Sequence, residues 1–209
     1  MRRVVMFMLA IAPMALSGQE EKVSSEIGFY AQGLTLKDID GKATNVMHSL
    51  IKGYAYQTDK VGLWGFAYGE KGYASSTVGL FYDFTDYFEV GVAGGAETIR
   101  NEEGYYQVFG RGAVSMLIGT DKLFVEAYYE NGASKEGWYE VDAMWRPSNR
   151  FGLGILAQKG VGTGPRVLVQ PLRGVPLEIF VAPYMYNTET KQTNSMLGVQ
   201  LVFKHRNRK

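Results

Sequence analysis

Three ionisable side chains occupy positions from which they could meet on one face of the folded chain. Glu126 and Asp142 lie opposite one another if the segment between them folds back near Ser134, and Arg111 lies on the segment before them. Like charges at short range repel unless a cation lies between them. The three residues therefore predict either an Arg111–Glu126–Asp142 network or a hydrated acidic patch that attracts cations.

Three roles are open for this group: a structural brace, a determinant of ion selectivity, or a divalent cation site. Two carboxylates outside a recognisable loop motif are weak support for a bound metal. We therefore predict no metal ligands and no cofactor.

The same parity of positions places a larger set of charged side chains on one face of the chain. Counted with Glu26, Asp83 and His48, this face carries nine acidic residues and four permanent cations. The charged residues that we predict to line a solvated interior are Lys52, Glu89, Glu97, Arg111, Glu126, Glu130, Glu140, Asp142, Arg146, Arg166 and Glu178.

The residue types that most hydrolytic chemistry needs are scarce. The chain has no cysteine and two histidines, His48 and His205, which argues against thiolate nucleophiles and multi-histidine metal centres. Ser49 follows His48 directly, and adjacent residues of a strand point to opposite faces. The glycine-rich stretch 160–164 precedes no helix whose N-terminus could bind phosphate. We expect that the protein is not an enzyme.

The sequence pattern predicts that short strands position these side chains. Apolar and polar residues alternate with a period of two, as in 89–93 and 197–203, and turn residues separate the runs. The pattern predicts an all-β fold: a closed up-and-down antiparallel transmembrane β-barrel of 12 strands, or of ten if two runs merge or fail. The expected strands are 23–35, 46–57, 61–69, 73–84, 87–99, 104–118, 122–131, 137–146, 150–160, 165–172, 175–186 and 193–204.

The expected connections alternate in length along the chain. Tight turns are expected at 58–60, 85–86, 119–121, 147–149 and 173–174, and longer loops at 36–45, 70–72, 100–103, 132–136, 161–164 and 187–192. Outer-membrane barrels carry short turns in the periplasm and longer loops outside. An even number of strands returns both termini to the periplasm. Even the longest loop, 36–45, is too short to fold inward as a plug.

Alternation alone fits a soluble barrel as well, so the polar face decides between the two. About twelve strands enclose more space than side chains readily fill, and charges such as Glu97 and Arg166 are costly in a dry core. Aromatic residues also gather at strand ends, like the belts at two lipid–water interfaces. The two groups are Trp64, Tyr82, Phe84, Phe88, Trp145, Phe151 and Phe203, and Tyr68, Tyr106, Tyr129, Tyr139 and Tyr186. A secreted soluble β-domain is the alternative, if the apolar face turns inward.

The two ends of the chain differ from its body. A basic start, an apolar run at 4–16 and small residues near Ser17 have the order of a secretory signal. We predict a signal peptide at 1–17, a barrel at 18–203 and a basic periplasmic tail at 204–209. Lys and Arg number 22 against 21 Asp and Glu. Because several of these cations lie in the leader and the tail, the body is acidic and no nucleic-acid partner is expected.

The last expected strand ends in a pattern known from one class of membrane protein. Gly198, followed by Leu201 and Phe203 two residues apart, resembles the C-terminal assembly signal of Gram-negative outer-membrane β-barrels, in which an aromatic residue closes the strand. Leu197 stands where a polar residue is usual, and six residues follow Phe203 where the signal normally ends the chain. The resemblance implies contact with outer-membrane lipid, insertion by the outer-membrane assembly machinery and location in the outer membrane of a Gram-negative cell.

The acidic inward face favours a porin-like passive channel for small hydrophilic solutes that mildly prefers cations. The alternative is a non-conducting barrel that serves as a surface interaction or envelope-stabilising module. Large residues of inward parity, among them Phe81, Tyr128 and Trp138, support this alternative because they could close the lumen. Pro183 lacks an N–H and should disturb the strand ladder near one rim.

Overall fold

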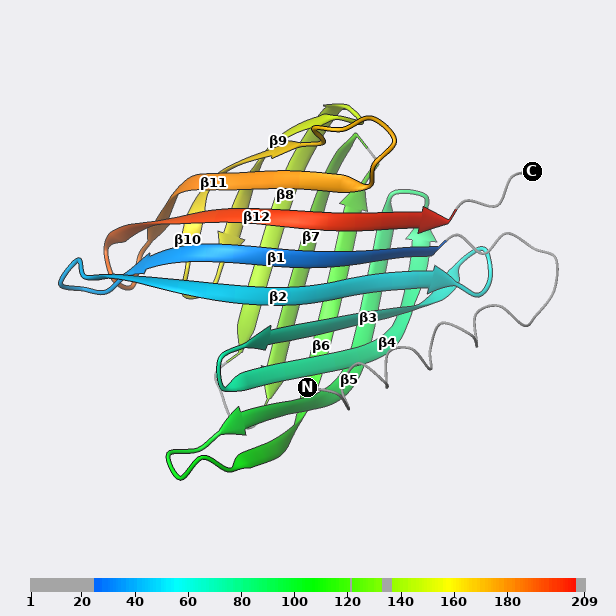
Figure 1. Cartoon of the computed structure of the whole chain (residues 1–209). Coiled ribbons are helices and arrows are strands. Elements are labelled where there is room, and N and C mark those ends of the chain that lie inside the picture. Colours follow the sequence, from blue (N-terminus) through cyan, green and yellow to red (C-terminus); the bar gives the residue numbers. More distant parts are fainter. Residues whose placement is uncertain (1–24, 121, 133–136, 206–209) are drawn as a thin grey trace.

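A computed structural model of the chain describes residues 25–120, 122–132 and 137–205. Within these ranges the chain forms twelve antiparallel strands in one closed barrel (Figure 1), so the predicted fold class is confirmed at twelve strands. No helix in the described part is long and apolar enough to cross a membrane. The expected signal peptide and residues 206–209 of the expected tail lie outside the described residues. The strands are β1 Ser25–Lys37, β2 Ala43–Tyr56, β3 Val61–Glu70, β4 Tyr73–Thr85, β5 Phe88–Arg100, β6 Tyr106–Gly119, β7 Leu123–Gly132, β8 Trp138–Ser148, β9 Phe151–Gln158, β10 Gly162–Val169, β11 Leu177–Asn187 and β12 Gln192–His205.

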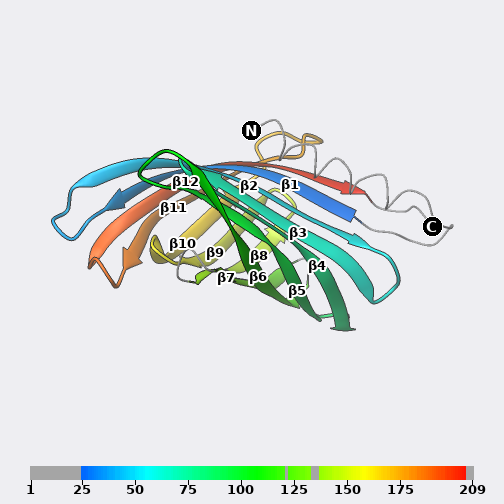
Figure 2. The same cartoon turned by 90° about the horizontal axis from the view of Figure 1, so that it is seen from below.

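Each strand pairs with its neighbours in sequence, and β1 pairs with β12 to close the ring. The closing ladder is continuous from Ser25 opposite His205 to Thr35 opposite Ser195. Closure leaves no strand with an unpaired edge, which a sheet surrounded by hydrocarbon requires. The strands β1, β2 and β12 form one wall, and β6, β7 and β8 form the wall across from it (Figures 1 and 2). The two walls cross steeply in Figure 1, as the tilted strands of a closed barrel do.

The outer surface of the barrel is apolar. The strict alternation of β-residues turns one parity outward, and that parity carries the exposed aliphatic side chains. Its members include Ile27, Phe29, Val78, Leu80, Val92, Val108, Val114, Leu153, Ile155, Val169, Leu197, Val199 and Leu201. The predicted orientation, with apolar side chains outward and ionised ones inward, is confirmed.

Most of the expected aromatic belt residues also lie on the outer surface. Tyr106, Tyr129, Tyr139 and Tyr186 are exposed toward one end, and Tyr82, Phe84, Trp145, Phe151 and Phe203 toward the other. Two assignments to the belts are wrong. Trp64 packs inside against Tyr128, with ring centroids 5.8 Å apart, and Tyr68 also faces the interior. Both have inward parity, so their place at a strand end was a misleading signal.

Two apolar clusters occupy much of the interior. The larger cluster joins residues of β1 and of β8 to β12, and its buried members are Leu34, Met144, Leu156, Val161, Leu168, Phe180, Ala182, Met185 and Met196. The smaller cluster is built on Leu50, Phe66, Ala113 and Tyr128. Gly198 gives room for the larger one, since a Cβ there would lie 2.0 Å from the ring of Phe180.

We call the end of the barrel that carries Ser25 and His205, where the first strand begins and the last strand ends, the terminal end, and the opposite end the loop end. The loop-end connections are 38–42, 71–72, 101–105, 133–137, 159–161 and 188–191, and the terminal-end connections are 57–60, 86–87, 120–122, 149–150 and 170–176. The predicted difference in length fails at one place, because the longest connection, 170–176, lies where a tight turn was expected at 173–174. Pro171 and Pro176 cannot donate to a ladder, so β10 ends at Val169 and β11 begins at Leu177.

The ladder between β10 and β11 is the least regular in the barrel. Thr163 pairs with Tyr186, and pairing then resumes only at Val167 opposite Val181, with a register shift between. The β11–β12 ladder shifts at Ala182–Met185, so the disturbance predicted at Pro183 is confirmed. Pro165 lies in the same gap on the facing strand. Two residues without an N–H thus leave one seam of the barrel with few backbone hydrogen bonds.

Candidate functional site

The charged side chains of the interior form three groups, and the first lies toward the loop end. Arg111 on β6 forms ion pairs with Glu97 on β5 and with Glu130 on β7, the latter at 2.7 Å. Tyr73 donates to Glu97 at 2.9 Å, and Tyr128 donates to Glu130 at 2.9 Å. Glu97 is completely buried. Two carboxylates share one guanidinium here, and each carboxylate also accepts a hydrogen bond from a tyrosine hydroxyl.

The second group spans the lumen. Lys52 on β2 reaches Glu140 on β8 at 3.1 Å and Glu126 on β7 at 3.5 Å. Because β2 lies far around the ring from β7 and β8, the lysine side chain must cross the interior. The contact ties opposite walls of the barrel together.

The third group lies between β8 and the strands that follow it. Arg166 on β10 forms an ion pair with Asp142 on β8, and its guanidinium carbon lies 4.4 Å from the centroid of the Phe180 ring. Arg146 contacts Glu178 on β11 at 3.3 Å, and Gln200 on β12 donates to the same carboxylate. The guanidinium carbon of Arg146 lies 5.9 Å from the centroid of the Phe124 ring, so each arginine has both an acidic partner and an aromatic face beside it.

The expected Arg111–Glu126–Asp142 network does not form as predicted. Glu126 and Asp142 do lie directly opposite each other on β7 and β8. Arg111, however, pairs in register with Gly132, because the residue opposite Glu126 on β6 is Leu117. This register carries Arg111 toward the loop end, so Lys52 and Arg166 provide the cations instead.

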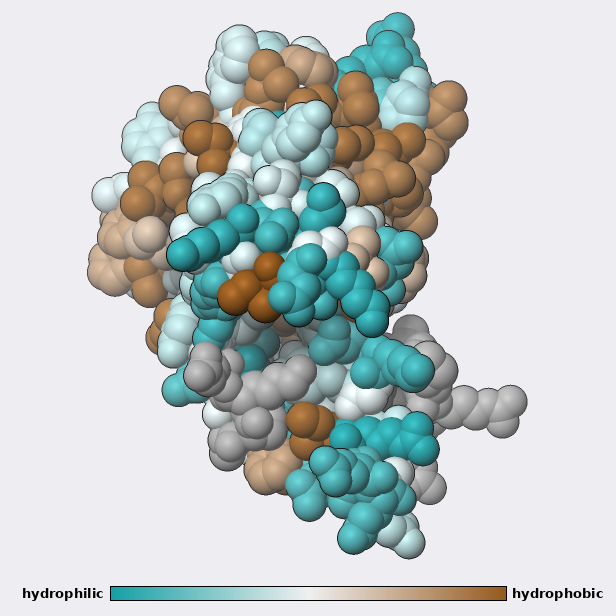
Figure 3. Space-filling model, turned by 90° about the vertical axis from the view of Figure 1, so that its left-hand side faces the viewer, coloured by the Kyte–Doolittle hydropathy of each residue, from teal (hydrophilic) through white to brown (hydrophobic). Residues whose placement is uncertain are grey.

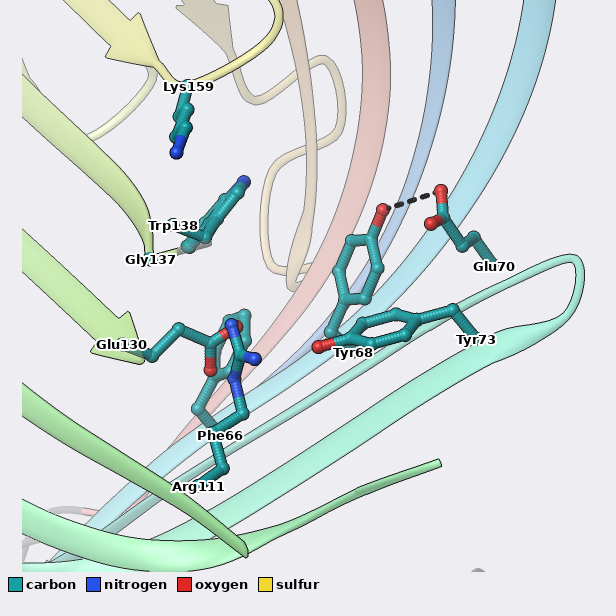
Figure 4. Close-up of a pocket in the computed structure, with 9 residues that line it drawn as sticks. All are labelled: Phe66, Tyr68, Glu70, Tyr73, Arg111, Glu130, Gly137, Trp138 and Lys159. Atoms are coloured by element: carbon teal, nitrogen blue, oxygen red, sulfur yellow. Dashed lines mark hydrogen bonds and ion pairs between the residues drawn. The ribbon is translucent and has the colours of Figure 1, made fainter. Parts of the chain in front are cut away.

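A cavity of about 290 Å³ opens at the loop end, above the first charge group. Its walls come from β3, β4, β6, β7, β8 and the β9–β10 connection (Figure 4). It is lined by Phe66, Tyr68, Glu70, Tyr73, Arg111, Glu130, Gly137, Trp138 and Lys159. Figure 3 faces this end of the barrel, where hydrophilic residues gather over the centre and hydrophobic ones toward the upper margin.

Most of this cavity was not predicted from the sequence. Glu70, Tyr73 and Lys159 were not among the predicted site residues, and Tyr68 was assigned to an aromatic belt. Glu70 was missed because it ends β3 at a position expected to be a loop. A usable signal was present: Tyr68 and Glu70 share the inward parity of Phe66, and the inward Tyr73 begins the next strand.

Aromatic side chains close the base of the cavity. Phe66 on β3 lies 4.7 Å from Tyr128 and 6.1 Å from Trp138, measured between ring centroids. Tyr128 and Trp138 are 5.7 Å apart, and Phe66 is 2 % exposed. Because β3 lies across the barrel from β7 and β8, these rings form a layer through the lumen. We call Phe66, Tyr128 and Trp138 the aromatic layer.

Below the aromatic layer the interior is more accessible. The inward side chain of Glu126 is 40 % exposed, and Leu117, paired opposite it, is 37 % exposed. Asp83 and Glu89 pair across β4 and β5 at the same end. The terminal end of the barrel therefore has an acidic, solvated mouth.

These observations define the class of barrel. Its ionised groups lie inside, its exposed aliphatic side chains lie outside, and its sheet has no open edge. Such a wall suits hydrocarbon rather than water. The chain has the fold of an outer-membrane β-barrel. Barrels of this architecture reside in the outer membrane, the predicted location.

Comparisons with known proteins found likenesses in structure alone. No family model matches the chain, and no curated protein matches it. Outer membrane phospholipase A from Escherichia coli matches with a TM-score of 0.47 and 8% identity, over 91% of this chain and 96% of that one. The toluene transporter TbuX of Ralstonia pickettii gives 0.41 and 10%, over 93% and 91%. The translocator domain of the autotransporter NalP from Neisseria meningitidis gives 0.33 and 11%, over 98% and 96%. Such scores and identities transfer neither activity nor ligand to this barrel.

The structure places the predicted site residues as follows. All eleven charged residues predicted to line the lumen have inward parity; seven of them, Glu97, Arg111, Glu130, Glu140, Asp142, Arg166 and Glu178, are buried, whereas Lys52, Glu89, Glu126 and Arg146 retain partial access. In the predicted assembly signal, Leu201 and Phe203 face outward, while Gly198 faces inward against Phe180. The outward pair is positioned to contact lipid.

Proposed function

We propose that this outer-membrane barrel is closed to passive diffusion and acts as a surface module whose loop end faces the exterior. The observation that carries the proposal is contact between opposite walls. Lys52 bridges β2 to β7 and β8, and the aromatic layer joins β3 to the same two strands. This is the alternative that the large inward residues favoured in the sequence.

The energetics support closure. A solute that crossed the barrel would have to separate Phe66 from Tyr128 and break the contacts of Lys52. Glu140 is buried and the Lys52 side chain is 22 % exposed, so breaking their contact costs less than the roughly 3–5 kcal/mol of a fully buried ion pair that loses one partner. The other half of the lumen is filled by the cluster around Phe180 and Met185, neither of which has measurable exposure. Passage there would require the core to unpack.

Conductance in planar bilayers tests the proposal. Folded wild-type protein should give no stable stepwise conductance, whereas Phe66→Ala combined with Tyr128→Ala should produce steps because the aromatic layer is lost. Trp145→Phe on the lipid-facing surface is the matched control and should give no conductance steps. Frequent, uniform steps from the wild-type barrel would overturn the proposal in favour of an open channel.

The second candidate is the cation-preferring channel for small hydrophilic solutes. The accessible carboxylate of Glu126 at the acidic terminal mouth favours it. If the barrel conducts, Glu126→Gln should lower the preference for K⁺ over Cl⁻, measured as a shift in reversal potential across a salt gradient. An unchanged reversal potential would mean that Glu126 does not set ion selectivity and only holds Lys52 in place.

We also propose that outer-membrane lipid surrounds the apolar wall, that the outer-membrane assembly machinery inserts the barrel, and that no nucleic acid is a partner. The barrel is also proposed not to be an enzyme: His48 contacts Glu70 at 3.1 Å and lies against the ring of Tyr68. Phospholipid hydrolysis by folded protein, compared with a His48→Ala variant, tests this. Activity that depends on His48 would contradict it.

A further inference from the structure

The cavity at the loop end has a chemistry that closure of the barrel does not explain. We propose that it binds one neutral saccharide ring from the exterior. The proposal rests on the proposed function, because a barrel closed by the aromatic layer turns this cavity into a blind pocket that opens outward.

The shape of the cavity suits a small cyclic ligand. At about 290 Å³ the cavity lies at the lower edge of the size range of small-molecule sites. It therefore suits a single ring better than an extended chain. Tyr68 lies 5.9 Å from Tyr73 and 6.4 Å from Trp138 between ring centroids. These rings offer the amphipathic aromatic surface on which the C–H face of a sugar ring packs.

The charges around the cavity favour a neutral ligand. The charged residues of the lining are Glu70, Glu130, Arg111 and Lys159, two of each sign. An organic cation would be attracted by the two carboxylates but repelled by the two basic groups. An anion would be attracted by the basic groups but repelled by the carboxylates. A ligand without net charge incurs neither repulsion.

The hydrogen-bonding groups of the cavity suit a ligand that carries hydroxyls. A sugar hydroxyl both donates and accepts, so its site needs both kinds of group around an apolar floor. Glu70 accepts from Tyr68 at 3.0 Å and contacts His48 at 3.1 Å, and Glu130 accepts from both Arg111 and Tyr128. A carboxylate offers about four lone-pair sites, so each can accept a further hydrogen bond beside these partners, and the ammonium of Lys159 has three N–H donors and lies on the other side of the cavity (Figure 4). Donors and acceptors thus surround the same aromatic rings.

Fluorescence titration of folded protein in detergent micelles tests the proposal. The chain has three tryptophans, and only Trp138 among them lines the cavity. D-glucose, D-galactose and N-acetyl-D-glucosamine serve as neutral probes, choline as the cation and inorganic phosphate as the anion. At least one sugar should change the emission with a dissociation constant in the millimolar range or below. Trp138→Phe should abolish the change, and Trp145→Phe, on the lipid-facing surface, should retain it.

Calorimetry with charge variants separates the ligand classes. For a neutral sugar, Glu70→Gln and Lys159→Met should each weaken binding by about tenfold, the effect of losing roughly one good hydrogen bond. For a cation, Lys159→Met should strengthen binding, and for an anion Glu70→Gln should do so. Unchanged heat-modifiable gel mobility shows that each variant remains folded.

The outcomes distinguish this proposal from the proposed function. Binding of choline or phosphate with no binding of any sugar overturns the saccharide assignment. Absence of binding to every probe overturns it as well. Maltose that binds as tightly as glucose identifies the end of a glycan as the source, and much weaker maltose binding identifies free monosaccharide. If the barrel binds sugar and also conducts, the proposal that it is closed is wrong and the saccharide proposal stands. If the barrel is closed but binds no sugar, only the saccharide proposal is wrong.

Discussion

Two carboxylates that lie opposite each other, Glu126 and Asp142, should differ sharply in their effect on stability. Asp142 is paired with Arg166, and both side chains are about nine-tenths buried, whereas the side chain of Glu126 is 40 % exposed. Asp142→Asn leaves a buried guanidinium without its charge partner and should cost about 3–5 kcal/mol. Glu126→Gln loses only a screened contact with Lys52 and should cost less than about 1 kcal/mol.

Urea unfolding of the two variants in lipid vesicles measures this difference. The pair is well matched, because both residues occupy the same register and the same face of adjacent strands. Equal costs would mean that the interior is uniformly hydrated. A larger cost for Glu126→Gln would reverse the assignment of which carboxylate braces the wall.

At the residue scale, the sequence predicts the face on which a side chain lies but not its partner. A strand alternates strictly, so the parity of Arg111 and Asp142 was sufficient to place both inside. The partner of Arg111 depends on the register of β6 against β7 and on which strands face each other after closure. Neither is encoded locally, and Lys52 meets Glu140 only because the barrel brings β2 and β8 together across the lumen.

At the scale of the elements, the β10–β11 seam should be the first ladder to open. Its four register pairs contrast with a continuous ladder between β1 and β2. Each missing backbone hydrogen bond is worth about 1 kcal/mol net, so loss of two should speed local amide exchange by roughly tenfold or more. Deuterium uptake by peptides from 162–169 and 177–187 should exceed uptake by peptides from 25–37 and 43–56.

Pro183→Val supplies an internal control for the seam, because it restores an N–H on the outer rim without removing an apolar side chain. Slower exchange in this variant would attribute the weakness to the missing donor. Exchange that is equally slow in all four peptides of the wild type would contradict the prediction.

The strands themselves were predictable within a few residues, and β10 was displaced most because Gly162 and Gly164 gave it the composition of a loop.

At the scale of the whole molecule, the sequence predicted closure of the sheet but not the filling of its interior. Phe66 and Phe180 have inward parity whether they line an open channel or meet their neighbours across it. The choice depends on how closely opposite walls approach, and hence on tilt and stagger around the entire ring. The same limit hid the cavity, since Glu70 at the end of β3 and Lys159 in the β9–β10 connection reach it from different sides.

The orientation of the whole barrel in lipid gives the final prediction. Val114 lies outward near the middle of β6 and is 47 % exposed, whereas Leu172 is similarly exposed in the connection 170–176 at the terminal end. A cation on the lipid face near the bilayer midplane costs about 2–4 kcal/mol and falls to about 0–1 kcal/mol near the interface. Val114→Arg should therefore lower the free energy of unfolding in vesicles by that larger amount, and Leu172→Arg should leave it nearly unchanged. Equal effects of the two substitutions, or wild-type protein that stays folded and monomeric without detergent or lipid, would show that the apolar surface does not face a membrane.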